Sequence, residues 1–330
     1  MNRPTVLVLR ALGLGDLLTA VPALRAIADA FPSERMALAA APALRPIVEL
    51  TGTVDGVIDV RPFDPAPIAG LRPRVAIDLH GRGPQSHRML LASDPDRLIA
   101  FHHPEVPASA GAPRWVEEEH EVERWCRLLT ESGIPADPDR LDIDPPQPTP
   151  VRDEGLTVLH PGAGSAARRW PPARWAEVAR AEVRTGRRVV LTGDATEAEV
   201  SSEIAVAAGL RRSAVLAGQT DLRRLATVVA SAGLVITGDT GTAHLATALG
   251  TPSVVLFGPT PPGRWGPPAD RPHHVAIWRG TIGDPHGRTV DPGLLGIGVP
   301  DVLEATTRAR AAGARSPDVV ATPHDRKVSA

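Results

Sequence analysis

The stretch LVITGDTGTAHLATALGTPSVVLF, residues 234–257, decides the fold. Its apolar run up to Thr237 is typical of a buried strand, residues 242–249 have helical spacing, and residues 253–257 form a second apolar run. Two parallel strands joined through a helix require a right-handed crossover, which packs the helix on one face of the sheet. The stretch therefore predicts an α/β fold built on parallel sheets.

The turn between the first strand and the helix carries the strongest functional signal. Gly241 leaves room for a phosphate against the main chain, and the free N–H groups of a helix start attract anions. Asp239 precedes this glycine, Thr240 and Thr242 add hydroxyl groups, and His244 falls in the first helical turn. A lone aspartate or histidine here is more often a helix cap or a core residue. Their convergence on one helix start favours an anion-binding site.

A second glycine-rich loop lies earlier in the same half. Residues 159–175 read LHPGAGSAARRWPPARW, and the loop follows an expected strand at residues 156–160. Ligands of parallel sheets bind at the carboxyl ends of the strands. Arg168 at this edge could neutralise a diphosphate. The alternative is that Arg168 and Arg169 are a solvated basic pair before a helix.

Strands and helices alternate along the whole chain. In the first half, strands are expected at residues 5–9, 36–40, 56–60, 74–79 and 97–101, and helices at 16–30, 42–50, 85–91 and 115–132. Pro22 should kink or split the first of these helices. In the second half, strands are also expected at residues 188–192 and 214–217, and helices at residues 172–185, 221–232 and 301 to about 312. A further helix is expected to begin at Thr196, with Glu199 completing its capping box.

A proline-rich segment separates the two halves. Residues 142–153 read DIDPPQPTPVRD, which indicates an extended linker. We therefore predict two Rossmann-like domains, residues 1–150 and 151–313, whose parallel sheets face each other across a cleft. Residues 314–330 are polar and are expected to form a disordered tail.

The first loop of the N-terminal half places an aspartate at a helix start. Residues 10–24 read RALGLGDLLTAVPAL, where Gly13 and Gly15 resemble the start of a dinucleotide fingerprint. Leu18 occupies the third glycine position and no acidic residue ends the next strand, which argues against a nicotinamide cofactor. Asp16 would lie at the edge of the cleft. It is either a functional carboxylate or a helix cap, and the residues alone leave both interpretations open.

A further polar loop follows the strand at residues 74–79. Residues 78–86 read DLHGRGPQS, and Arg88 lies just beyond. His80, Arg82 and Arg88 could meet polar or phosphate groups of an acceptor. An ordinary polar loop explains the same residues equally well.

Composition and charge narrow the function classes. The net charge is −2, which argues against a nucleic-acid binder with a basic surface. A single cysteine, Cys126, rules out an intrachain disulfide and argues against a zinc cluster. Arg10 and Asp16 interrupt the first apolar run, so no secretory signal is expected. We expect a cytoplasmic protein that would meet a membrane-embedded acceptor at the membrane surface.

No metal or other cofactor is expected. The Asp-x-Asp pairs at residues 94–96, 137–139 and 142–144 lie beside prolines in expected loops, and the histidine pairs at 102–103 and 273–274 lack partners at ligand spacing. We therefore assign no metal ligands.

Taken together, three motifs resemble glycosyltransferase family 9, the ADP-heptose:lipopolysaccharide heptosyltransferases. They are Gly15-Asp16, HPGAGSAARRWPPARW at residues 160–175, and GDTGTAHLATALGTPSVVLFGPTPPGRWGP at residues 238–267. The resemblance implies a GT-B fold, inversion at the anomeric carbon and no metal requirement. The N-terminal domain would bind the acceptor, and the C-terminal domain would bind a nucleotide-diphosphate sugar, in the family ADP-heptose.

The resemblance also assigns roles to residues. Asp16 matches the catalytic base, next to Gly15 on the acceptor side. Arg168 matches a position usually filled by a lysine that contacts the donor phosphates, and Glu197 matches an acidic residue suited to the donor ribose. The remaining donor-site residues lie in the turn after Thr237: Asp239, Thr240, Gly241, Thr242 and His244.

Two other functions stay open at this point. A non-hydrolysing nucleotide-sugar epimerase of the same fold would act on the donor without an acceptor. A catalytically silent sugar-nucleotide binding subunit would bind the donor without turnover. The acceptor itself, a glycan, a lipid-linked sugar or a natural product, is not determined by these residues.

Overall fold

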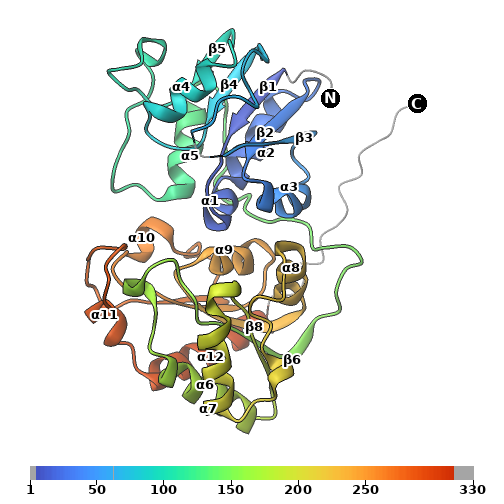
Figure 1. Cartoon of the computed structure of the whole chain (residues 1–330), viewed down its shortest axis with the longest axis vertical. Helices are drawn as coiled ribbons and strands as arrows, with labels where there is room; N and C mark the ends of the chain where they lie inside the picture. The colour runs from blue at the N-terminus through green and yellow to red at the C-terminus, as the bar shows by residue number, and fades with distance from the viewer. Residues whose placement is uncertain (1–4, 62, 316–330) are drawn as a thin grey trace.

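The computed structural model describes residues 5–61 and 63–315, which form two lobes joined end to end (Figure 1). The N-terminal lobe holds a parallel five-stranded sheet with the strand order β3-β2-β1-β4-β5. Its strands are β1 (Val6–Leu9), β2 (Met36–Ala40), β3 (Gly56–Asp59), β4 (Val75–Asp78) and β5 (Arg97–Ile99). Each lies where the sequence predicts a strand.

The C-terminal lobe holds a second parallel five-stranded sheet, ordered β10-β9-β8-β6-β7. Its strands are β6 (Asp153–His160), β7 (Arg188–Leu191), β8 (Ala232–Gly238), β9 (Ser253–Leu256) and β10 (His274–Ile277). The expected α/β fold of GT-B type, with two parallel sheets and their helices, is confirmed. The predicted strand at residues 214–217 is wrong, because only Val215 pairs there, in an isolated bridge to Leu191. The edge strand β10 was not predicted.

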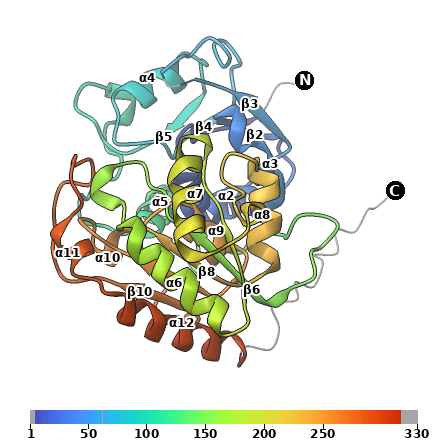
Figure 2. The ribbon, with the colours of Figure 1, turned by 60° about the horizontal axis from the view of Figure 1, so that its bottom comes forward.

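Helices cover both sheets. In the N-terminal lobe they are α1 (Leu14–Thr19), α2 (Val21–Ala30), α3 (Arg45–Thr51), α4 (Gln85–Leu91) and α5 (Glu121–Glu131). Pro22 splits the first expected helix into α1 and α2, as predicted. In the C-terminal lobe they are α6 (Pro172–Arg184), α7 (Ala198–Ala208), α8 (Leu222–Ser231), α9 (Gly241–Ala248), α10 (Pro262–Trp265), α11 (Pro292–Leu295) and α12 (Val299–Gly313). Helices α6, α7 and α12 lie side by side on the outer face (Figure 2).

The helix predicted at residues 115–132 begins later than expected. His120 is the N-cap of α5, and its Nδ1 accepts a hydrogen bond from the Val122 N–H at 3.3 Å. The preceding turn instead wraps around Arg124, whose Nη2 donates to the carbonyls of Val116, Glu117 and Glu119. Because these carbonyls bond a side chain rather than the main chain, residues 115–120 are not helical.

The start of α7 also differs from the sequence prediction. A short 3-10 turn, Ala195–Glu197, precedes α7, and Asp194 is the N-cap of that turn, with its carboxylate accepting from the N–H groups of Thr196 and Glu197. Glu197, not Thr196, is the N-cap of α7 itself. Glu197 completes the capping box in place of Glu199, with its Oε2 2.9 Å from the Asp194 nitrogen. Asp194 is an equally good capping residue, and Glu197 follows it at the same capping-box spacing as Glu199 follows Thr196. The sequence spacing alone therefore does not choose between the two starts.

The two lobes pack directly on each other through helices. Helix α1 lies against α9, and α3 lies against α8. One apolar cluster runs through this junction and includes Leu17 and Leu18 from the N-terminal lobe with Leu225 and Leu245 from the C-terminal lobe. Burial of such side chains contributes about 25 cal/mol per Å² of apolar area. The lobes therefore share part of their core.

In each sheet the strand order reverses at one point, between β1 and β4 in the first and between β6 and β8 in the second. Ligands of open α/β sheets bind outside the carboxyl ends of the strands at such a switch point. The loops after these four strands carry the four groups of residues singled out in the sequence. The fold thus places all of them at the two edges that a ligand would meet.

The described part of the chain contains no helix that is long and apolar enough to cross a membrane. The predicted tail begins at residue 314, and residues 316–330 lie outside the described residues. The exact domain boundary near residue 150 stays a prediction.

Candidate active site

The first turns of α1 and α9 meet at the junction of the lobes. A Cβ added to Gly241 would lie 2.8 Å from the Leu14 Cβ and 3.0 Å from the Gly15 nitrogen. A Cβ added to Gly15 would lie 2.9 Å from Cδ2 of His244. Both glycines are thus needed for the close approach of the lobes. The approach brings Asp16, next to Gly15, opposite the turn that precedes α9.

Asp16 takes part in the cap of its own helix and is still accessible. Gly13 is the N-cap of α1, and Asp16 Oδ2 accepts from the Gly13 N–H at 3.1 Å. The second carboxylate oxygen, Oδ1, lies 3.6 Å from Arg10 Nη2, and the side chain is 30% exposed. The cap and the functional interpretation are therefore compatible, because each uses a different oxygen.

Asp239, in the turn before α9, is buried next to Arg168. Burial raises the pKa of Asp239 to about 6, while the Arg168 charge acts in the opposite direction. Arg168 Nη1 donates to the Asp239 carbonyl at 3.2 Å and lies 3.8 Å from its carboxylate. The Arg168 Nε is buried and has no partner among the described residues. The side chain as a whole is 26% exposed, so the exposed part of the guanidinium can donate to an anionic ligand.

The ionisation of Asp239 predicts a pH-dependent cost to folding. Its pKa is about 6 in the folded chain, against an ordinary value of 3.8, so the cost is present above about pH 6 and disappears toward pH 4. A pKa difference of about two corresponds to about 3 kcal/mol. We expect wild type to lose stability relative to Asp239→Asn as the pH rises from about 5 to about 7.5, measured by urea unfolding. A stability difference that does not change with pH would contradict this.

The other residues of the α9 turn are well packed. Thr240 is the N-cap, with its Oγ1 3.0 Å from Thr237 Oγ1, and Thr242 is buried. Burial lowers the pKa of His244 to about 4, so its ring is neutral at pH 7. The ring packs edge-on against Trp265 and lines, with His120, a cavity of about 20 Å³ between the lobes. His244 thus supports the junction rather than adding charge to the site.

Glu197 connects the loops after β6 and β7. Its Oε2 accepts from the Asp194 N–H, and it also bonds the Ala163 main chain. Burial is the largest cause of the raised pKa of this carboxyl group. A Cβ added to Gly162 would lie 1.9 Å from Glu197 Oε1, so the chain approaches the carboxylate very closely here. Glu197 lies at the ligand edge of the sheet, and its role toward a ribose stays a prediction.

This close approach gives a test of the donor side. Gly162→Ala would push the Glu197 carboxylate out of its place, because the added methyl overlaps it. Loss of one hydrogen bond to a charged group costs about 1.5–3 kcal/mol, so we expect the Kd of ADP to rise by about tenfold or more. Isothermal titration calorimetry measures this. Unchanged ADP affinity would place Glu197 outside the donor site.

Of the four residues predicted for the acceptor, Gly15 lies at the contact of α1 with α9, and the other three differ in their surroundings. His80 lies next to the Asp16 loop, and its Nδ1 accepts from the Ala11 N–H at 3.2 Å. Burial lowers the pKa of His80 to about 4, which keeps this nitrogen an acceptor. Arg82 and Arg88 are exposed and face acidic side chains of their own lobe, Glu117 at 3.8 Å and Glu105 at 2.7 Å.

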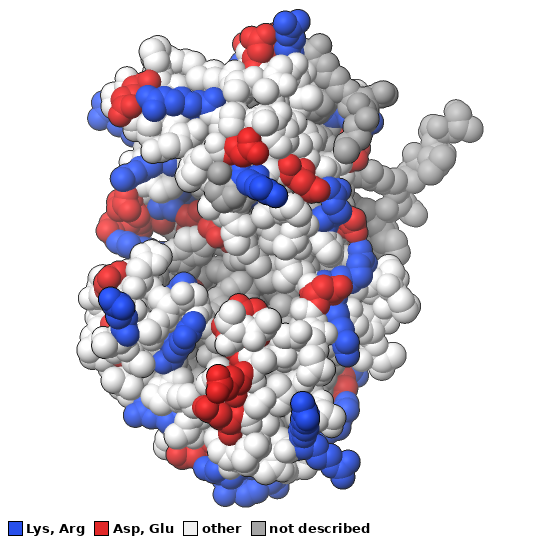
Figure 3. Space-filling view, in the orientation of Figure 1, with Lys and Arg blue, Asp and Glu red and all other residues white. Residues whose placement is uncertain are grey.

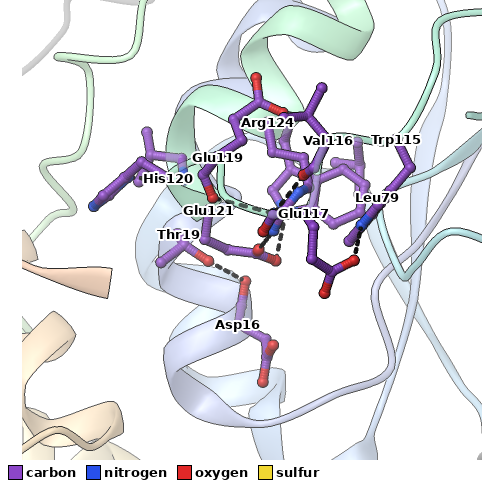
Figure 4. Close-up of polar contacts among 12 residues, drawn as sticks. Asp16, Thr19, Leu79, Trp115, Val116, Glu117, Glu119, His120, Glu121 and Arg124 are labelled. Carbon is purple, nitrogen blue, oxygen red and sulfur yellow. Dashed lines mark hydrogen bonds and ion pairs between the residues drawn. The ribbon is translucent and has the colours of Figure 1, made fainter. Parts of the chain in front are cut away.

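Sequence reasoning missed a buried group of residues behind Asp16. Arg10 is fully buried and its Nη2 lies 3.0 Å from Glu121 Oε1. Figure 4 shows Asp16 and Thr19 on α1 beside Glu121 and Arg124 of α5. An arginine directly after a buried strand is the signal in the sequence that could have pointed to Arg10. Nothing in the sequence pairs it with Glu121, which is far along the chain.

Charge is mixed on the face seen in Figure 3, where basic and acidic side chains alternate. Among the described residues, no group of three or more His, Cys, Asp or Glu side chains is placed to hold a metal ion.

Known proteins resemble the chain in sequence and in fold. Residues 112–282, more than half of the chain, match the family description of glycosyltransferase family 9 (heptosyltransferase). The Escherichia coli ADP-heptose lps heptosyltransferase II structure superposes with a TM-score of 0.75 at 21% identity, covering 93% of this chain and 98% of that one. The E. coli heptosyltransferase WaaC with ADP gives 0.71 at 19% identity, covering 92% and 99%.

A third structure with the same fold contains a metal. The iron-containing dodecameric glycosyltransferase TibC from enterotoxigenic E. coli H10407 superposes with a TM-score of 0.59 at 14% identity, covering 96% of this chain and 81% of that one. No curated protein matches the sequence.

Proposed function

Since the chain belongs to glycosyltransferase family 9 and is a glycosyltransferase, we propose that it transfers a sugar from a nucleotide diphosphate with inversion and without a metal. The observation that carries this proposal is the contact between Gly15 and the α9 turn. This contact supports the proposal, because Asp16 follows Gly15 with a partly exposed side chain, and the start of α9 suits a diphosphate.

The reaction follows from this arrangement. An acceptor hydroxyl attacks the anomeric carbon from the side opposite the leaving diphosphate, and Asp16 takes the proton of that hydroxyl. Negative charge that develops on the diphosphate is met by Arg168 and by the free N–H groups at the start of α9. These donors supply the positive charge that a metal provides in other transferases, which supports metal independence. The packing of α1 on α9 supports a site from which water is excluded during transfer.

We propose an ADP-linked sugar, most specifically ADP-heptose, as the donor. Support comes from the family description and from the matched WaaC structure, which holds ADP. The acceptor is a hydroxyl group of a glycan, a lipid-linked sugar or a natural product, bound by the N-terminal lobe. A cytoplasmic location with peripheral membrane contact is part of the proposal, and the single cysteine supports it.

The test is a panel of ADP-, UDP- and GDP-sugars, each with a set of hydroxyl acceptors and with or without EDTA. We expect transfer from the ADP-sugar, an inverted anomeric configuration by NMR, and unchanged rates in EDTA. Retention of configuration or loss of activity in EDTA would overturn the mechanism. Isomerised sugar without an acceptor would indicate an epimerase, and donor binding without any turnover would indicate a binding subunit.

A further inference from the structure

A fully buried arginine lies directly behind the Asp16 turn. We propose that Arg10, fixed by Glu121, is a positioning residue that sets the place of Asp16 for proton transfer. This inference rests on the proposed role of Asp16 as the base. It concerns how the chain holds that base, and the support comes from contacts of Arg10 that the sequence did not reveal.

The guanidinium of Arg10 joins the two loops at the switch point of the N-terminal sheet. Its Nε donates to the Asp16 carbonyl at 2.8 Å, and its Nη1 donates to the Leu79 carbonyl. Its Nη2 donates to Glu121 Oε1 at 3.0 Å and to Thr19 Oγ1 at 3.4 Å. One planar group, projecting from the loop after β1, thus bonds helix α1, the loop after β4 and helix α5. Its rigid fork fixes the three relative to each other.

The Asp16 carbonyl depends on this arginine because α1 is short. The Ala20 N–H bonds Leu17, so it does not serve the Asp16 carbonyl. That carbonyl instead accepts from Arg10 Nε and from Thr19 Oγ1 at 3.0 Å. Arg10 therefore holds the main chain from which the Asp16 carboxylate projects.

Glu121 holds Arg10 in turn. Its Oε1 also accepts from Trp125 Nε1 at 2.9 Å, and its Oε2 accepts from Arg124. The Arg10 guanidinium stacks 4.7 Å from the Trp125 ring centroid. Arg10, Glu121 and Arg124 form a buried Arg-Glu-Arg group, an arrangement that apolar residues often replace with equal or higher stability. A purely stabilising role would not require it, whereas placing Asp16 does.

Arg10→Lys tests the proposal, because an ammonium keeps the charge but cannot span the three partners. We expect kcat to fall by about 10²-fold, as for a displaced catalytic group, while the Kd of ADP stays within about twofold. The number of ADP sites per chain, from calorimetry, reports the folded fraction. A kcat within about threefold of wild type at full ADP occupancy would overturn the proposal.

A double-mutant cycle separates positioning of Asp16 from a general loss of structure. In an Asp16→Asn background, Arg10→Lys should lower the residual kcat by less than about twofold, because the group that it places is gone. A loss as large as in wild type would refute the positioning role. If Asp16→Asn alone leaves kcat intact, the assignment of the base fails instead.

Two further variants control the result. Arg127→Lys is a matched control, because Arg127 lies on α5, pairs with Glu119 at 2.7 Å and does not contact Glu121; its kcat should stay within about twofold. If Arg10→Lys does not fold, Glu121→Gln acts on Asp16 only through Arg10 and should lower kcat by about tenfold with unchanged ADP affinity. No change of kcat in this variant would overturn the proposal.

Discussion

Asp16→Asn is expected to lower kcat for sugar transfer by about 10²–10⁴-fold while the Kd of ADP stays within about twofold. The amide has the shape of the carboxylate, and its oxygen can still accept from the Gly13 N–H, so the α1 cap survives. It cannot take a proton from the acceptor hydroxyl. Steady-state ADP release gives kcat, and calorimetry gives the ADP affinity.

Two comparisons make this result specific. Asp221→Asn changes another aspartate at a helix start, the N-cap of α8, where asparagine caps equally well, and it should leave kcat unchanged. Arg168→Ala should show the opposite pattern, a rise of about tenfold or more in the Kd of ADP, because it removes the partly exposed guanidinium proposed to meet the diphosphate. Normal transfer by Asp16→Asn would mean that the base lies elsewhere.

Much of this site could be predicted because parallel strands end at one edge of a sheet. The alternation of apolar runs with helical segments was enough to predict β1, β4, β6 and β8. The residues of the loops that follow these strands could then be identified in the sequence. For that reason the sequence could place Asp16, Arg168 and Asp239 at the ligand edges, whereas their roles stay predictions. Local rules also worked where one signal dominates, as at Pro22.

Local rules failed where two signals compete or where the partner is distant in sequence. The capping box before α7 is formed by Asp194 and Glu197 on a short 3-10 turn rather than by Thr196 and Glu199, because two acceptable capping pairs occur close together. The turn before α5 is organised by the Arg124 side chain instead of helical bonds. The pairing of Arg10 with Glu121 joins residues 111 positions apart, and no periodicity can reveal it.

The packing of one lobe on the other is a second property that the sequence could not supply. The sequence of each half is enough to predict its sheet and the edge where a ligand binds, and the linker between the halves predicts a cleft. The direct contact of Gly15 with Gly241 depends on the relative orientation of the lobes, which tertiary packing decides. This contact is also where a single methyl group should have its largest effect.

Gly241→Ala is expected to lower kcat by about 10²-fold. The added methyl would lie 2.8 Å from the Leu14 Cβ and 3.0 Å from the Gly15 nitrogen, and a main-chain atom cannot move aside alone. The α1 and α9 turns must separate, which moves Asp16 away from the donor, and a displacement of about 1 Å can cost 10²-fold. Steady-state kinetics measure kcat.

Stability measurements and two other glycine variants test whether the clash between the lobes causes the loss of kcat in Gly241→Ala. Alanine favours a helix over glycine by about 1 kcal/mol, so a lower melting temperature in Gly241→Ala would report the clash and not the helix. Gly263→Ala in α10, whose methyl would meet nothing within 4 Å, should keep kcat and stability. Gly15→Ala approaches the same contact from the other lobe, against the His244 ring, and should also lower kcat. If Gly241→Ala and Gly15→Ala both retain wild-type kcat, then catalysis does not require this approach of the lobes, and the carboxylate opposite the α9 turn is not the working base.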